Sequence, residues 1–529
     1  MRVRTSVDDC HQLSLKRILV IGSGAVGLFL AKRLRDHGLP VLLVESGEEA
    51  LGGFPPNSFE SVGRRHDGVR IGRSRSLGGT SNLWGGQLVE FEPHDVNGRA
   101  WLEGSAWPLA FEELRRHYPS SFESLGVPSQ FHDDRKVWEG VVGSTPGVSG
   151  DVEVFLTRWM NSPSLADLFA KQIRSDRDLA VLTGHTATGF QYDGPRVASV
   201  VVKDRDGREH RIPAKQVVIA CGTIESTRLL LAAAHENPSL CPWSGNDNVG
   251  RYFQDHLGGR VASVIPSDRS ALMRTFCTIR WKGQKFQPKV RFRSEGALVP
   301  GRLGVHGMVM FESSVSEHLQ YLKQFLKAAV YSRRLGGIGD LWSHGIASAR
   351  YLPPLMLTYL RDHRVFVPGD SRIAINVQAE QFPLRDSRIT IDPARRDRFG
   401  LPAAVVDWRV DGREVKVLRD FVAACDAAFR AAGIGQVRPE AALAAGDPSF
   451  LDTLRDTNHP AGGARMGRSR EDGVVDSDLR VFGTSNLFVA GAAVFPTSSA
   501  ANVTFTAMAL ASRLAEHLSV GSFHAASTR

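Results

Sequence analysis

The segment R-I-L-V-I-G-S-G-A-V-G-L-F-L-A-K-R-L, residues 17–34, decides the fold of this chain. Its apolar run at 18–21 is typical of a buried parallel strand, and Gly22, Gly24 and Gly27 then follow with G-x-G-x-x-G spacing. The apolar residues after them recur at helical spacing, which places the N-terminal end of a helix beside the glycine turn, where it can bind a phosphate. The segment therefore predicts a Rossmann-like nucleotide-binding unit.

A second apolar run and an acidic residue complete this unit. Residues 41–44 predict the next buried strand, and Glu45 ends it, 18 positions after Gly27. A carboxylate at this position can accept hydrogen bonds from a ribose diol. Strand, glycine turn, helix, strand and acid follow one another in the order of a nucleotide site, which favours this interpretation over a fortuitous glycine-rich turn.

Two later segments extend the pattern. Residues 74–87, S-R-S-L-G-G-T-S-N-L-W-G-G-Q, have two glycine pairs among small and polar residues, as expected where backbone lies against a flat ring or a phosphate. An ordinary surface loop is the alternative. Residues 217–231, V-V-I-A-C-G-T-I-E-S-T-R-L-L-L, repeat the order of apolar strand, glycine turn and helix. We interpret the repeat as a return of the chain to the same nucleotide.

Near the C-terminus, His459 in N-H-P-A-G-G-A-R-M-G and Asn502 in S-S-A-A-N-V-T-F stand 43 positions apart. If the fold brings them together, the histidine would supply a base for an alcohol proton and the asparagine a polar anchor for the alcohol oxygen. We therefore expect these two residues to be catalytic.

Five motifs in this order resemble the glucose-methanol-choline (GMC) family of FAD-dependent oxidoreductases. They are I-G-S-G-A-V-G with Glu45, L-G-G-T-S-N-L-W-G-G-Q, V-V-I-A-C-G-T-I-E-S-T-R-L-L-L, N-V-G-R-Y-F-Q-D-H at 248–256, and a closing block between 458 and 511. The G-G-x-S-x-x-W pattern is most similar to the pyranose-oxidase-like branch. The resemblance implies an α/β fold, with a discontinuous Rossmann-like FAD-binding domain and an α+β substrate domain built on a large antiparallel sheet.

The family's site residues carry over to this sequence position by position. The glycine turn would hold the pyrophosphate, Glu45 the adenosine ribose, and the backbone at Ala187 the adenine. The helix that opens at Asn502 would direct its N-terminal end at the pyrimidine edge of the flavin, where the helix dipole stabilises negative charge. The implied FAD-binding residues are Gly22, Gly24, Gly27, Glu45, Gly79, Thr80, Ser81, Ala187, Gly491, Ala492, Asn502 and Val503.

The resemblance also implies a reaction, the oxidation of an alcohol to a carbonyl with hydride transfer to flavin N5 and His459 as the general base. The motif around Trp84 favours a sugar or glycoside as substrate, whereas the apolar segment 314–364 favours a lipid-like or natural-product alcohol. Oxygen or a quinone-like carrier would accept the electrons. A lyase or decarboxylase on the same fold, or a non-catalytic flavin-binding subunit, is the alternative.

Three positions depart from the family pattern. Gly463 stands where many members have threonine, and Val503 stands where many have proline, so the detailed geometry of the site does not carry over from the family. Leu83 replaces the histidine that the pyranose-oxidase-like branch bonds to its flavin. Leucine cannot form this bond, so we expect non-covalent FAD.

The cofactor motifs occur in three separated stretches of the chain. We expect the FAD-binding domain to comprise residues 14–97, 178–262 and 453–519, and the substrate-binding domain to comprise residues 98–177 and 263–452.

Alternating apolar residues predict strands within the substrate-binding part. Residues 371–382 and 386–392 are expected to be two strands of the large sheet, with 403–410 as a third, and residues 412–433 predict an amphipathic helix. The segment 314–364 has apolar residues at helical spacing, which predicts either two packed helices or an apolar lid or membrane-facing surface.

Composition limits the partners. The net charge of +9 comes from 65 basic residues scattered among 56 acidic ones, so we expect a solvated surface and no nucleic-acid partner. No group of His and Cys has metal-ligand spacing, and we expect no metal site. The N-terminal sequence lacks an apolar signal region and no 18-residue apolar stretch occurs, so we expect a cytoplasmic protein without a transmembrane segment.

Overall fold

The computed structural model describes residues 3–4, 18–49, 57, 59–313, 357, 362–365 and 367–526. Most of the segment 314–364 lies outside these residues, so the two interpretations of that segment stay predictions. Within the described ranges, no helix has both the length and the apolar character needed to cross a bilayer.

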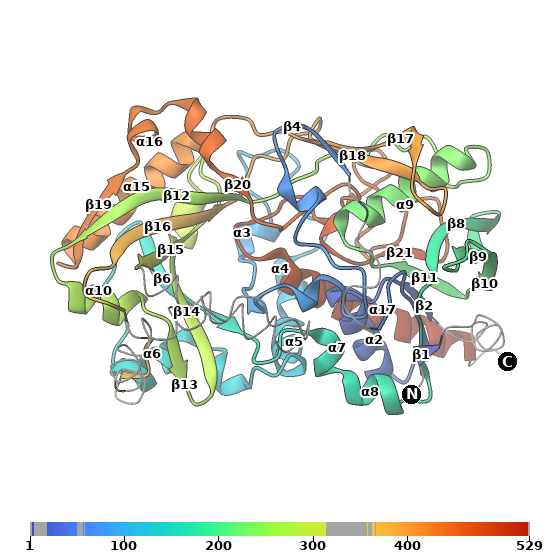
Figure 1. Cartoon of the computed structure of the whole chain (residues 1–529), viewed down its shortest axis with the longest axis horizontal. Helices are drawn as coiled ribbons and strands as arrows, with labels where there is room; N and C mark the ends of the chain where they lie inside the picture. The colour runs from blue at the N-terminus through green and yellow to red at the C-terminus, as the bar shows by residue number, and fades with distance from the viewer. Residues whose placement is uncertain are drawn as a thin grey trace, which may run out of the picture.

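A parallel six-stranded sheet lies at one end of the molecule, near both chain termini (Figure 1). Its order is β1 (Val3–Arg4), β7 (Leu179–Leu182), β3 (Val41–Val44), β2 (Ile18–Ile21), β11 (Gln216–Ile219) and β21 (Leu487–Val489). Every residue of β2 and β3 is buried, as expected for strands covered on both faces. Helix α2 (Ala25–Asp36) follows β2 and packs on helix α17 (Val503–Ala526).

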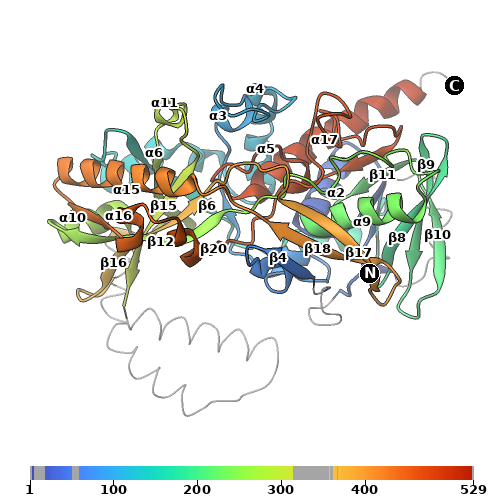
Figure 2. The same cartoon turned by 90° about the horizontal axis from the view of Figure 1, so that it is seen from above.

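An antiparallel nine-stranded sheet lies at the opposite end (Figure 2). Its strands are β19 (Gly435–Pro439), β12 (Leu257–Pro266), β16 (Arg372–Ala379), β15 (Val305–Glu312), β14 (Gln284–Phe292), β6 (Val152–Trp159), β5 (Gln87–Leu88), β13 (Ile279–Trp281) and β20 (Arg455–Asp456). Helix α15 (Glu414–Ala431) covers one face, where Phe421 shares a core cluster with Val290 and Val309. The predicted α/β fold with a large antiparallel sheet is confirmed.

Two of the predicted strands belong to a different sheet. The strand expected within 371–382 is β16 of the large sheet, as predicted, and the expected helix is α15. Residues 386–392 and 403–410 do contribute strands, β17 (Arg388–Arg396) and β18 (Pro402–Trp408). These pair with each other, and β18 also pairs with β4 (Glu60–Gly63), in a separate three-stranded sheet. Alternation of apolar residues identifies a half-buried strand but does not specify its hydrogen-bonding partner, so their assignment to the large sheet was wrong.

A further antiparallel sheet of β8 (Thr186–Asp193), β9 (Arg196–Lys203) and β10 (Glu209–Pro213) follows β7. The remaining α-helices are α3 (Pro93–Val96), α4 (Phe111–Arg115), α5 (Tyr118–Ser124), α6 (Asp134–Val142), α7 (Leu165–Leu168), α8 (Ala170–Ser175), α9 (Thr223–Glu236), α10 (Arg269–Phe276), α11 (Ser294–Ala297) and α16 (Ala441–Ala445). The predicted domain boundaries are not tested by this arrangement and stay a prediction.

Candidate active site

A cavity of about 280 Å³ opens at the carboxyl ends of β2, β3 and β11, which is where open α/β sheets bind their ligands. Its walls include the turn between β2 and α2, the turn between β11 and α9, and the first turn of α17. The sequence-predicted residues that line it are Gly22, Gly24, Glu45, Gly79, Thr80, Ala187, Gly491, Ala492 and Val503.

Glycine is required at the walls of this cavity for two different reasons. A Cβ on Gly22, whose φ is +100°, would lie 2.6 Å from the Ala220 carbonyl oxygen, and one on Gly79, whose φ is +52°, would lie 2.7 Å from Gly24 Cα. In contrast, a Cβ on Gly24 or Gly491 would meet nothing within 4 Å and would enter open space. The first pair brings segments of backbone together, and the second pair leaves room for a ligand beside the backbone.

Gly27 and Ser81 do not line the cavity but support it from behind. A Cβ on Gly27 would lie 2.0 Å from the Gly22 carbonyl oxygen, so this glycine lets α2 pack against the turn. The buried Ser81 hydroxyl donates to the Gly78 carbonyl at 2.5 Å and accepts from the Leu165 amide at 3.1 Å. Both residues shape the site without facing it.

Glu45 is buried at the end of β3, and its carboxylate is held in place by four donors. The Ser23 amide and hydroxyl donate to Oε2 at 2.9 and 2.7 Å, and the Gly47 amide donates to Oε1 at 2.7 Å. The Ser46 hydroxyl is the fourth donor, 3.5 Å from Oε1. Glu45 lines the cavity, where its carboxylate can reach a ligand.

His459 and Asn502, distant in sequence, are in contact at the edge of the cavity. Asn502 Nδ2 lies 2.9 Å from His459 Nε2, and the neighbouring residues Asn458, Pro460 and Val503 line the cavity. Among the described residues, the buried Oδ1 of Asn502 has no hydrogen-bond partner. A buried acceptor without a partner marks a place where a ligand can bind.

Three further side chains surround the other imidazole nitrogen of His459. Thr457 Oγ1 lies 2.7 Å from His459 Nδ1, Gln378 Nε2 lies 2.9 Å from it, and His256 Nδ1 lies 3.2 Å from it. A neutral imidazole carries one proton. When Nδ1 holds that proton and donates it to the Thr457 hydroxyl, the Gln378 amide nitrogen is a second donor and does not bond to Nδ1. In this tautomer Nε2 has a free lone pair toward Asn502 and can act as a base.

Asp255 anchors the loop that carries the imidazole. Its buried Oδ1 accepts from the backbone amides of His256 at 2.7 Å, Thr457 at 3.2 Å and His459 at 3.0 Å. His66 Nε2 lies 3.0 Å from Oδ2. One carboxylate therefore joins the residues before strand β12, the 457–459 loop and the 66–69 turn beside His459.

Burial and neighbouring charges set the protonation of these groups. Burial, followed by the neighbouring His256, lowers the pKa of His459 to about 3, so its imidazole is neutral near neutral pH. Burial raises the pKa of Asp255, but the hydrogen bond from His66 and the neighbouring histidines His66, His459 and His256 together outweigh this effect and leave the pKa below its ordinary value. Burial lowers the pKa of His66, and Asp255 reverses this and leaves it raised.

Asp456 lies beside this pair, which makes His66, Asp255 and Asp456 a compact group of potential metal ligands, with one atom from each within 4.8 Å of the others. Their oxygens already serve protein donors, since Asp456 accepts the amides of Asp67 at 2.6 Å and Gly68 at 3.0 Å. We interpret the group as a buried anchor for the loop.

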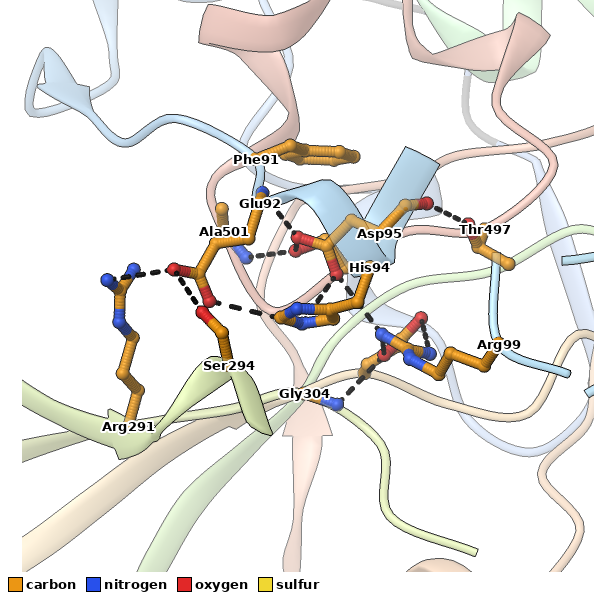
Figure 3. A network of polar contacts seen from close by, with 12 residues as sticks. Phe91, Glu92, His94, Asp95, Arg99, Arg291, Ser294, Gly304, Thr497 and Ala501 are labelled. Atoms are coloured by element: carbon orange, nitrogen blue, oxygen red, sulfur yellow. Dashed lines mark hydrogen bonds and ion pairs between the residues drawn. The ribbon is translucent and has the colours of Figure 1, made fainter. Parts of the chain in front are cut away.

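A second polar network holds the loop that precedes Asn502 (Figure 3). Asp95 of α3 accepts at its backbone carbonyl from the Thr497 hydroxyl at 3.1 Å and at Oδ2 from the Ser499 hydroxyl at 2.8 Å. Arg99 donates to Asp95 at 3.1 Å and bonds the buried Glu380 at 2.8 Å. Residues 92–99, far from the C-terminus in sequence, thus position the start of α17.

The sequence singled out the residues of the cavity and the His459–Asn502 pair, and the structure places them together; their roles stay predictions. Gln378 and His256 are not among the site residues predicted from the sequence, yet both side chains contact the His459 ring. Thr457 and His66 carried no signal in the sequence, although Asp255 and His256 stand in the quoted motif at 248–256.

Comparison with known protein families gives two matches. Residues 17–276 match the model of the FAD dependent oxidoreductases, and residues 383–511 match the model of the GMC oxidoreductases. Together these segments contain the β2–α2 turn, the β11–α9 turn, His459 and Asn502.

Several characterised relatives align over nearly the whole chain. The 2-methyl-1,2-propanediol dehydrogenase of Mycolicibacterium austroafricanum is 24% identical, with 95% of each chain covered. The paromamine 6'-oxidase of Streptomyces fradiae is 23% identical, with 94% of this chain and 90% of the relative covered. Among solved structures, a fungal aryl-alcohol oxidase has a TM-score of 0.57 at 15% identity, with 96% of this chain and 99% of that chain covered. Pyridoxine 4-oxidase from Mesorbium loti has a TM-score of 0.54 at 19% identity, covering 95% and 98%. The structural likenesses bear on the fold alone.

Proposed function

Because this chain belongs to the GMC oxidoreductases, an FAD-dependent family, we propose that it oxidises an alcohol to a carbonyl with His459 as the general base. The observation that carries the proposal is the contact between His459 Nε2 and Asn502 Nδ2, 2.9 Å, at the edge of the cavity. This contact brings a base and a hydrogen-bonding amide to one point at the N-terminal end of α17.

The cavity residues fit an FAD molecule. The open space beside Gly24 and Gly491 admits phosphates close to the backbone, and α2 begins there without a side-chain cap, so its first amides can bind an anion. Glu45 would accept the ribose hydroxyls, and the backbone at Ala187 would meet the adenine. The first turn of α17, which opens at Val503 and contains no acidic residue, would support negative charge on the flavin.

When bound, FAD supplies the acceptor for the hydride that leaves the carbinol carbon. His459 Nε2 takes the hydroxyl proton of the same alcohol, so that the alcohol loses one proton and one hydride and becomes a carbonyl. Asn502 cannot act as a base near neutral pH. Without substrate, its amide instead bonds to Nε2 and keeps the imidazole in place. When the substrate oxygen takes the amide's position at Nε2, the amide donates to that oxygen.

The relatives named above act, by their names, on a diol and on paromamine, and sugar-like or apolar alcohols are the proposed substrate classes for this chain. Oxygen or a quinone-like carrier is the proposed electron acceptor. Contact with a membrane surface belongs to the prediction that segment 314–364 forms an apolar lid or a membrane-facing surface. The cytoplasmic location stays a prediction.

An anaerobic screen of alcohols for flavin bleaching tests the function. We expect at least one sugar-like or apolar alcohol to bleach the bound flavin stoichiometrically, with the matching carbonyl formed in equal amount. A protein that holds flavin but is bleached by no alcohol would instead be the non-catalytic subunit, and conversion of a substrate without net bleaching would indicate a lyase or decarboxylase.

The absence of an attachment residue predicts how the cofactor is released. Leu83 is 53% exposed and precedes Trp84, and its side chain carries no atom that can bond a flavin. We expect FAD to appear in the supernatant after acid or heat precipitation, which absorbance at the flavin bands would detect. Yellow colour that stays with the precipitated chain would contradict non-covalent binding.

Replacing Glu45 by Ala should weaken FAD retention by about 10–100-fold in Kd, because charge-assisted hydrogen bonds contribute about 1.5–3 kcal/mol each. Titration of the apoprotein with FAD measures this. Glu45→Gln, which keeps one acceptor oxygen, should lose less. Glu48→Ala is a matched control, because Glu48 pairs with Arg205 and does not line the cavity. Equal FAD affinity in Glu45→Ala and Glu48→Ala would exclude the ribose contact.

A further inference from the structure

Lys289 on strand β14 is a buried cation with no acidic partner in the part of the chain that the structure describes. The residue is only 2% exposed. Its Nζ donates to Gln87 Oε1 at 3.1 Å and to Gln378 Oε1 at 2.8 Å. Both acceptors are neutral carboxamide oxygens. Among the described residues, no carboxylate forms an ion pair with Lys289 or opposes the effect of burial on it. Lysine is almost never fully buried unless it is paired.

The ammonium group is incompletely satisfied as well as unpaired. It has three N–H donors, and the described residues provide acceptors for two of them. Burial lowers the pKa of Lys289 to about 7, which measures how costly its charge is in this environment. An anion that supplied a counter-charge and the third acceptor would remove this cost.

Lys289 is also close to the proposed chemistry. The Gln378 carboxamide contacts Lys289 Nζ on one side, at 2.8 Å, and His459 Nδ1 on the other, at 2.9 Å. A single side chain therefore separates the ammonium from the imidazole. Gln87 belongs to the 74–87 segment, whose residues Gly79 and Thr80 line the cofactor cavity.

Arg291, a neighbouring cation on the same strand, already has acidic partners. Arg291, two residues further along β14, pairs with Glu92 at 2.8 Å and Glu153 at 2.9 Å. These two acids are on the Arg291 side, and neither pairs with Lys289. The unneutralised positive charge is thus located at Lys289, on the side next to His459.

We propose that Lys289 binds an anionic group of the substrate, so that the enzyme acts on an alcohol that also carries a carboxylate. This inference rests on the proposed alcohol oxidation and narrows its substrate class. The carboxylate takes the third donor of Nζ, while the carbinol lies at His459 and Asn502. A neutral alcohol at the same place would leave the ammonium without a counter-charge.

Matched pairs of alcohols test the proposal on the FAD-loaded wild-type protein. One pair is 4-(hydroxymethyl)benzoate and 4-(hydroxymethyl)benzamide, and an aliphatic pair is 6-hydroxyhexanoate and 6-hydroxyhexanamide. Anaerobic stopped-flow reduction gives Kd and the limiting rate for each. In at least one pair, we expect the acid to bind at least about 30-fold more tightly than its amide, the lower end expected for a desolvated charge pair. Equal or weaker binding of the acid in both pairs would overturn the proposal.

Variants then assign the preference to one side chain. Lys289→Met and Lys289→Gln should bring the acid-to-amide Kd ratio close to one while amide binding stays within a few-fold. Lys285→Met is the matched control, because Lys285 is on the same strand and lies over the Trp159 ring, 3.4 Å from its centroid. It should keep the wild-type ratio. A Lys289→Met protein that retains FAD and the full acid preference would contradict the assignment, and the wild-type ratio decides the proposal if neither variant folds.

A titration that needs no turnover separates this inference from the proposed function. Binding of 4-methylbenzoate, followed by the change in flavin absorbance, should saturate in the wild type and weaken at least about 30-fold in Lys289→Met. If neutral alcohols reduce the flavin, but 4-methylbenzoate does not bind and neither acid binds more tightly than its matched amide, only this inference fails. If 4-methylbenzoate binds through Lys289 but no alcohol reduces the flavin, the proposed function fails and the anion site stands.

Discussion

Replacing His459 by Ala is expected to slow anaerobic flavin reduction by about 10²–10⁴-fold while FAD stays bound. An alcohol is a poor hydride donor until its proton begins to leave, and the neutral imidazole next to Asn502 is placed to accept that proton. His459 does not line the cofactor cavity, so its loss should not release the cofactor. Stopped-flow reduction with a reactive alcohol, together with the flavin-to-protein absorbance ratio, measures both effects.

Further variants test the same assignment of the base. His459→Gln keeps polar contacts without a base and should be nearly as slow as His459→Ala. Asn502→Ala should cost less, and the double variant should lose less than the product of the single losses, because the groups act as a unit. His459→Ala reduced at the parental rate would refute the assignment of the base.

The lowered pKa of His459 predicts the pH profile of the same step. The value of about 3 lies below the ordinary 6.5, so the imidazole stays unprotonated as the pH falls through about 6. The limiting rate of flavin reduction should therefore stay level between about pH 5 and pH 8, and protonation should lower it only in stronger acid. A decline centred near pH 6.5 that is lost in His459→Gln would contradict the lowered pKa.

Replacing Asp255 by Ala should cost about 3–5 kcal/mol of unfolding free energy and slow flavin reduction by about 10²-fold or more. The change leaves His66 without its buried partner and removes the acceptor for the backbone amides of His256, Thr457 and His459. The loop that carries the base would then shift. Denaturant unfolding and stopped-flow reduction of the FAD-loaded protein measure the two losses.

Asp247, eight residues before Asp255, offers a matched control for this prediction. Asp247 forms ion pairs too, with Arg251 at 3.0 Å and Arg385 at 2.5 Å, but its side chain is 68% exposed. Asp247→Ala should cost less than about 1 kcal/mol and leave the rate unchanged. Asp255→Asn keeps one acceptor oxygen and should fall between the two. A rate in Asp255→Ala equal to that of Asp247→Ala would show that the anchor does not position the base.

Much of the cofactor side of the site could be predicted from the sequence because its signals are local. The strand at 18–21, the glycine turn and helix α2 are contiguous, and the position of Gly27 follows from its close approach to the Gly22 carbonyl within that unit. Glu45 ends the next strand and faces the same edge of the sheet, because parallel strands present their carboxyl ends together.

The substrate side could not be predicted in the same way. Residues 388–396 and 402–408 had the alternation of strands of the large sheet, yet they pair with each other, and 402–408 pairs with β4. Local periodicity does not specify the partner of a strand. Gln378 reaches His459 only because its strand, β16, lies beside β12 in the sheet. Asp255 and His256 directly precede β12.

By itself, the sequence determined the nucleotide-binding unit, the order of the cofactor motifs and the identity of the His459–Asn502 pair, since each is a short segment with its own chemistry. Tertiary structure alone decided what surrounds the pair. A lysine at 289 is, in sequence, one polar residue on an alternating strand, and such residues usually face water. It becomes a buried cation near the imidazole, with no acidic partner among the described residues, because strands distant in sequence bury it between Gln87 and Gln378. Such burial is a property of the assembled fold.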